Sequence, residues 1–209
     1  MIPVKVLAVR YLANASHSLC EALGAPDGYP ALGLLTTDCD DATYIALDAA
    51  TKAADVKVSY GRSFYAGAAN ASTPNAGEVI GILAGATPGA VRSGMDAALA
   101  ALQRVGFESA GEVPYLAHTV SSVGSYLAKE AGVPEGSAIA YLIAPPLEGM
   151  YALDAALKAA DVKLCKLYAP PSETNFGGGL LSGTQSACDA ACAAFAAAVE
   201  EVAARPLER

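Results

Sequence analysis

The stretch ALDAATKAADVK at residues 46–57 recurs as ALDAALKAADVK at residues 152–163, with one difference in twelve positions. Chance does not readily produce such a match, so the chain contains two copies of one structural unit. In each copy the alanine-rich amphipathic stretch indicates a helix, and the apolar runs that precede it, residues 31–35 and 139–144, indicate buried strands. The 209 residues therefore predict two domains, which we place at residues 1–108 and 109–209.

The same order of strands and helices extends through both copies. A second strand, a loop with glycine and small polar residues, a third strand and a final helix follow the repeated helix. The second and third strands are expected at residues 56–60, 78–83, 162–168 and 179–182, and the final helices at residues 88–105 and 185–204. A further strand and helix precede each apolar run, at residues 4–11, 16–23, 115–120 and 122–131, and residues 106–113 form the expected linker. The fold class is α/β in the broad sense that includes α+β.

Composition and charge limit the class of protein. Hydrophobic residues make up 54% of the chain and charged residues 16%, so we expect other subunits to cover part of the apolar surface. The net charge of -8 argues against a nucleic-acid partner, because phosphate binding needs clustered Lys and Arg. No apolar run reaches the ~18 residues of a membrane span, and no signal peptide is evident. We expect a cytosolic oligomer that binds neither nucleic acid nor membrane.

The inventory of reactive residues argues against catalysis. His17 and His118 lie in segments without a nearby motif, so no Ser–His–Asp or Cys–His pair is supported. Cys188 and Cys192 stand one helical turn apart, which suits small-residue packing or one metal ion, and packing is favoured because no histidine is near them in sequence. We expect no enzyme, no catalytic residue, no metal and no cofactor.

Two short motifs leave alternatives open. Asp38, Asp40 and Asp41 suit a divalent cation, but acids just before a helix are more often a cap that interacts favourably with the helix dipole, and we prefer that interpretation. The glycines at 177–179 resemble a phosphate cradle, yet neither G-x-G-x-x-G nor a following Gly-Lys-Ser/Thr is present.

Both halves resemble the bacterial microcompartment shell domain, through the apolar strand, the alanine-rich helix ending in Ala-Asp-Val, the glycine-bearing loop and the last helix. Longer segments are similar to tandem-domain shell proteins of ethanolamine utilisation: DCDDATY at 38–44, YGRSFYAG at 60–67, GSYL at 124–127 and PPSETNF at 170–176. The resemblance implies two tandem, circularly permuted shell domains, each an antiparallel sheet flanked by helices. It also implies a homotrimer whose six domains form a near-hexagonal plate, tiled with other shell proteins around a bacterial microcompartment.

The resemblance further implies a central pore lined by the loops before each third strand, here about residues 64–76 and 171–179. Small residues and glycines give such loops the freedom to open and close, although plain flexible turns are the alternative. The implied pore residues are Phe64, Tyr65, Ala66, Gly67, Ala68, Ala69, Asn70, Asn175, Phe176, Gly177, Gly178 and Gly179.

In the same family, ethanolamine binds in a small pore within each subunit, and the corresponding positions are Asp40, Glu78 and Phe107. Carboxylates in a partly dry cleft can accept hydrogen bonds from an ammonium group. The plainer alternative is that Asp40 starts a turn and Glu78 opens a surface strand. A protein of a different class, a cytosolic tandem-domain metabolite-binding regulator, is the alternative to a shell tile.

Overall fold

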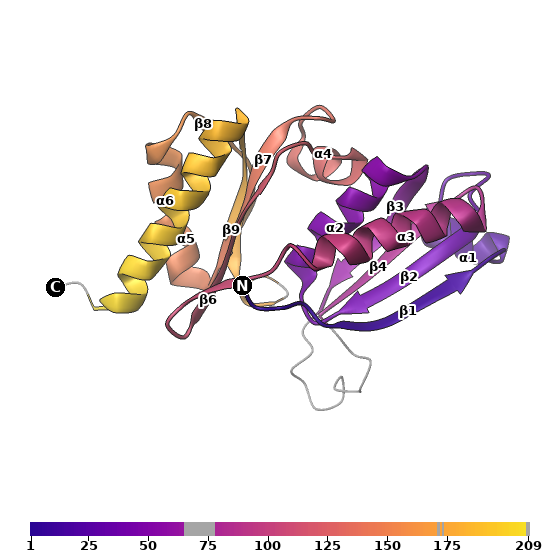
Figure 1. The fold of residues 1–209 in the computed structure, drawn as a ribbon, viewed down its shortest axis with the longest axis horizontal. Helices are drawn as coiled ribbons and strands as arrows, with labels where there is room; N and C mark the ends of the chain where they lie inside the picture. The colour runs from indigo at the N-terminus through magenta and orange to yellow at the C-terminus, as the bar shows by residue number, and fades with distance from the viewer. Residues whose placement is uncertain (65–77, 171, 173, 208–209) are drawn as a thin grey trace. The chain divides into compact units, whose positions relative to one another are not determined.

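The computed structural model describes residues 1–64, 78–170, 172 and 174–207. The chain divides into two units, one with residues 3–106 and 124–127, the other with residues 1–2, 107–123 and 128–209. Each unit carries an antiparallel sheet with helices packed on it (Figure 1), so the predicted mixed class with antiparallel sheets is confirmed.

The unit that holds most of the first half has a sheet with strand order β1-β2-β4-β3. Small residues stand opposite large ones on one face of this sheet. Leu35 pairs with Gly81, and Leu47 of the second helix packs on Gly81. The first helix covers the other face, where Cys20 packs with Leu32 and Ile82. The elements are β1 (Val6–Leu12), α1 (His17–Ala22), β2 (Ala31–Thr37), α2 (Asp40–Ala53), β3 (Val56–Ser63), β4 (Val79–Gly85) and α3 (Pro88–Leu102).

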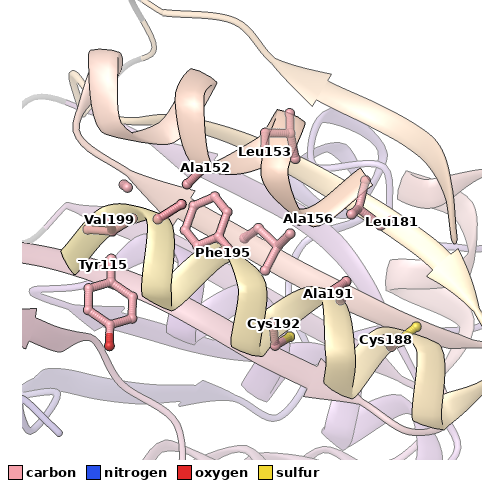
Figure 2. Close-up of a cluster of buried hydrophobic side chains, with 14 of the residues drawn as sticks. Tyr115, Ala152, Leu153, Ala156, Leu181, Cys188, Ala191, Cys192, Phe195 and Val199 are labelled. Atoms are coloured by element: carbon pink, nitrogen blue, oxygen red, sulfur yellow. The ribbon is translucent and has the colours of Figure 1, made fainter. Parts of the chain in front are cut away.

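The other unit has the strand order β5-β6-β7-β9-β8. Its core lies between the sheet and two alanine-rich helices, where Phe195 is fully buried against small residues such as Ala152 and Ala156 (Figure 2). Cys188 and Cys192 are buried in the same core. The elements are β5 (Glu108–Ala110), β6 (Val113–Val120), α4 (Ser125–Ala131), β7 (Ala138–Ala144), α5 (Pro146–Ala159), β8 (Val162–Tyr168), β9 (Gly177–Gly183) and α6 (Gln185–Ala204). The first three residues of α4 group with the other unit.

The structural repeat extends beyond the stretch that reveals it in the sequence. A β-bulge interrupts β3 between Val58 and Tyr60, and an equivalent bulge interrupts β8 between Leu164 and Lys166. After α1 and α4 the chain makes the same turn. Glycines with positive φ stand at matching positions, Gly24 at 69° with Gly132 at 65°, and Gly28 at 80° with Gly136 at 86°. The two halves therefore correspond residue by residue around α1 and α4.

Several element boundaries differ from the sequence expectation, and three of these differences affect the description of the second half. The expected linker contains a short strand, β5, which pairs with β6. The helix expected from residue 122 begins at Ser125. The strand expected from residue 179 begins at Gly177, because these glycines lack the side chains that would block close pairing with β7. A Cβ atom on Gly178 would lie 1.9 Å from the carbonyl oxygen of Leu142, and its φ of 154° is one that L side chains rarely adopt.

Candidate ligand site

The start of α2 is fixed by short-range hydrogen bonds. The Thr37 hydroxyl accepts from the Cys39 amide at 3.1 Å and lies 2.7 Å from the Thr43 hydroxyl. Cys39, and not an aspartate, is the N-cap residue. Asp40 and Asp41 occupy the first turn, where negative charge interacts favourably with the helix dipole. The expected interaction with the helix dipole is therefore available to these two residues, whereas the expected capping by an aspartate is wrong.

Asp38 has a different role from its two neighbours. Its carboxylate accepts a hydrogen bond from the Lys5 amide at 2.7 Å, and its own amide donates to the Lys5 carbonyl at 3.2 Å. Asp38 therefore ties the chain that leads into β1 to the end of β2.

Asp40 is a buried carboxylate whose polar partners come from its own helical turn and from β3. Its side chain is held by the Asp41 amide, 2.8 Å from Oδ1, and by the Ser63 hydroxyl. Ser63 in turn lies 2.6 Å from the Tyr44 hydroxyl. Burial raises the pKa of Asp40, because a charged carboxylate loses its hydration there, and the hydrogen bonds from Ser63 and Asp41 offset only part of that rise.

Glu78 lies directly before β4 and beside the same cluster. Its amide donates to the Thr37 carbonyl at 2.9 Å, and its carbonyl accepts from Phe64 at 3.0 Å. Burial raises the pKa of Glu78, and the negative charges of Asp40 and Asp38 raise it further. Within the described residues, no Lys or Arg forms an ion pair with these three carboxylates. Ionised carboxylates of this kind can accept charge-assisted hydrogen bonds from a cation.

The predicted ligand residues do not all lie in one unit. Asp40 and Glu78 share the unit with α2 and β4, whereas Phe107 belongs to the other unit. The Phe107 ring packs edge to face on Phe176, with ring centroids 5.6 Å apart. Sequence reasoning missed Ser63 and Tyr44, although they lie inside the motifs at residues 60–67 and 38–44. Spacing in the sequence does not show that a residue of β3 reaches the start of α2.

The predicted pore residues fall into three groups. Phe64 follows the end of β3, and Asn175 and Phe176 form a turn before β9, in which the Phe176 amide donates to the Ser172 hydroxyl at 3.2 Å. The three glycines are buried in β9. The remaining pore residues, Tyr65, Ala66, Gly67, Ala68, Ala69 and Asn70, lie outside the described residues.

The described part of the chain contains neither a metal-binding cluster nor a membrane-spanning helix. No group of three or more His, Cys, Asp or Glu residues is arranged there to hold a metal ion. Burial raises the pKa of the Cys192 thiol to about 11, which disfavours the thiolate that a metal needs. No helix among these residues is long and apolar enough to cross a membrane.

Comparison with known proteins identifies the family. The BMC domain matches residues 31–114. The bacterial microcompartment shell protein EutL of Clostridium perfringens is 59% identical, over 99% of this chain and 97% of that protein. This chain belongs to the EutL family of bacterial microcompartment shell proteins. EutL of Escherichia coli is 47% identical, over 100% of this chain and 97% of its own length.

A solved EutL structure agrees with the fold throughout. The crystal structure of ethanolamine utilization protein EutL from Leptotrichia buccalis matches with a TM-score of 0.97 and 57% identity, covering 100% of this chain and 98% of that one. Because EutL relatives are shell proteins, the predicted resemblance, the non-enzymatic character and the location in a bacterial microcompartment are confirmed.

Proposed function

We propose that this chain is a structural tile in the shell of an ethanolamine-utilisation microcompartment, and that three copies form a six-domain plate. The observation that carries the proposal is the full-length similarity to EutL, at 59% identity, in a chain that contains the domain twice. Two like domains on one chain need only threefold closure to present six similar edges. Such a plate would tile with other shell proteins.

Sedimentation and electron microscopy test the assembly. At micromolar concentration we expect a particle of three times the chain mass, and at higher concentration flat sheets with a near-hexagonal repeat. A monomer, or a discrete particle that never forms sheets, would contradict the shell tile. The second of these outcomes, combined with a metabolite that alters partner binding, would instead favour the regulatory alternative.

We also propose that Asp40 and Glu78 bind ethanolamine, whereas Phe107, which belongs to the other unit, stays a prediction. Support comes from the clustered carboxylates with raised pKa values and no ion-pair partner in the described residues. An ammonium group favours the ionised carboxylates and donates charge-assisted hydrogen bonds to them. Affinity should therefore rise with pH as Asp40 and Glu78 lose their protons, and fall in acid.

Titration calorimetry with ethanolamine tests this site. Loss of a charge-assisted bond costs about 1.5 to 3 kcal/mol, so Asp40→Asn should weaken binding roughly 10- to 150-fold at pH 7. Asp161→Asn, at an exposed position of the second half, is the matched control and should bind as the parent does. Equal affinity of the parent and Asp40→Asn, or affinity that does not fall as the pH is lowered from 7 to below 4, would refute the assignment.

The central pore is proposed at the loop that includes Phe64 to Asn70 and at the turn of Asn175 and Phe176, which leads into the buried glycines Gly177 to Gly179 of β9. The turn at Asn175 and Phe176 supports this, because it directly precedes β9 and leaves Asn175 exposed. A threefold-averaged electron-microscopy map of the assembled plate should place Phe64 and Asn175 around the symmetry axis. A map that places them at the outer edge would remove the pore assignment.

A further inference from the structure

A fully buried aspartate of the repeat holds a segment distant in sequence. Asp48 of α2 has a side chain that is 0% exposed. Its carboxylate accepts hydrogen bonds from the amides of Gly124 at 2.8 Å and Leu127 at 2.9 Å. Beside it, the Thr51 hydroxyl accepts from the Ser125 amide at 3.2 Å. Residues 124–127 belong to the same unit as α2, so this contact lies within one unit.

The second copy of the repeat has the same aspartate without such a partner segment. Asp154 occupies the position of Asp48 in the twelve-residue repeat, on α5. Its side chain is 62% exposed and pairs with Lys158, one turn along the helix. Leu157 stands where Thr51 does. The aspartate is thus buried under residues 124–127 in the first repeat and is exposed in the second repeat.

The counterpart of the bound segment is also uncovered. The turns after α1 and α4 match, with the Ala25 amide bonded to Cys20 and the Val133 amide bonded to Ala128. Residues 16–19 therefore correspond to residues 124–127. Leu127 is 1% exposed, whereas Leu19 is 41% exposed. Ser16, the N-cap residue of α1, makes no side-chain capping bond.

We propose that α5 of one copy binds residues 16–19 of a second copy, as α2 binds residues 124–127 within one chain. The Asp154 carboxylate accepts from the amides of Ser16 and Leu19, and Leu19 becomes buried. The Leu19 amide, which contacts the Ser16 carbonyl at 3.1 Å, shares its hydrogen with the carboxylate. The inference rests on the proposed trimer and names its contacts. Each chain offers one surface of each kind, so the contact is head to tail and can close a ring.

The proposed contact of residues 16–19 with α5 differs in one respect from the observed contact of residues 124–127 with α2. A Cβ atom on Gly124 would lie 2.8 Å from the Asp48 carbonyl oxygen and 2.3 Å from the Thr51 hydroxyl oxygen. Ser16 carries a Cβ, so its segment lies slightly farther from α5. In the proposed contact, the short distance between Gly124 and Thr51 places the side chains of Ser16 and Leu157 next to each other.

Disulfide trapping tests this contact. Adjoining Cβ atoms about 4 Å apart can form a disulfide. Under mild oxidation, Ser16→Cys combined with Leu157→Cys should give covalently linked dimers and trimers on a non-reducing gel, and reductant should reverse them. The parent and both single variants control for the five native cysteines. Ser16→Cys with Lys163→Cys is the matched control pair and should remain unlinked.

Sedimentation of Asp154→Ala gives a second measurement. We expect this variant to associate at least tenfold more weakly than the parent, with Asp154→Asn between them and Asp161→Ala unchanged. A parent that forms trimers while the cysteine pair stays unlinked and Asp154→Ala associates normally would overturn this inference and leave the proposed function intact. A monomeric parent would overturn the proposed function as well.

Discussion

At the residue scale, environment gives identical side chains different properties. Asp48 and Asp154 occupy the same position in the repeat, yet one is buried and the other is largely exposed. Asp40 and Glu78 are acidic residues in a chain of net charge -8, and their significance comes from burial near each other without a countercharge in the described residues. Sequence can nominate such residues, but their protonation depends on what surrounds them.

Asp40→Asn should stabilise the ligand-free protein at neutral pH. Burial raises the pKa of Asp40, so the stability it contributes is present below its unfolded-state pKa and is lost as pH rises through its folded-state value. Asparagine can still accept a hydrogen bond and carries no charge. We expect a gain of up to about 1 kcal/mol at pH 7 that vanishes near pH 4, measured by urea unfolding. If the substitution changed the unfolding free energy equally at both pH values, or lowered it at pH 7, this expectation would be contradicted.

At the element scale, hydrophobic patterns predicted strands and helices well, and close contacts set their ends. The helix expected at residues 185–204 is observed with those bounds, because a long alanine-rich pattern has few competing structures. By contrast, β9 begins two residues early, and residues 108–110 form a strand inside the expected linker. A glycine run has no periodicity, so only its pairing with β7 shows that it is a strand.

Gly178→Ala should be strongly destabilising. The added Cβ would overlap the Leu142 carbonyl oxygen, in a backbone conformation that alanine rarely adopts. We expect a loss of about 3 kcal/mol or more in thermal or urea unfolding. Gly89→Ala is the matched control, because its Cβ would meet nothing closer than 3.9 Å, in the first turn of α3. That variant should be neutral or slightly more stable. A neutral Gly178→Ala would show that β7 and β9 tolerate wider spacing.

At the scale of the whole molecule, the unit that contains α2 includes four residues from the second half of the sequence. Asp48 holds this segment through two backbone amides. The division at residues 108 and 109 remains a prediction, and the repeat alone does not indicate that residues 124–127 group with the earlier part of the chain.

Asp48→Ala should loosen that segment. Two buried amides would lose their acceptor, which we expect to cost about 2 to 4 kcal/mol of unfolding free energy. Hydrogen exchange at Gly124 and Leu127 should accelerate more than exchange in α6. Asp48→Asn, which keeps one acceptor oxygen, should fall between this variant and the parent. Unchanged exchange at both amides would show that other contacts hold residues 124–127.

The sequence by itself determined the duplication, the mixed α/β class and the similarity to microcompartment shell domains, because these depend on local periodicity and on motifs that remain readable along the chain. It also nominated Asp40 and Glu78. Only the tertiary structure decided that Ser63 contacts both Asp40 and Tyr44, that the glycines of β9 form a tightly paired strand, and that one of two identical aspartates is buried. These features arise from contacts between residues distant in sequence. The repeat does not predict them, because both copies have nearly the same residues while their surroundings differ.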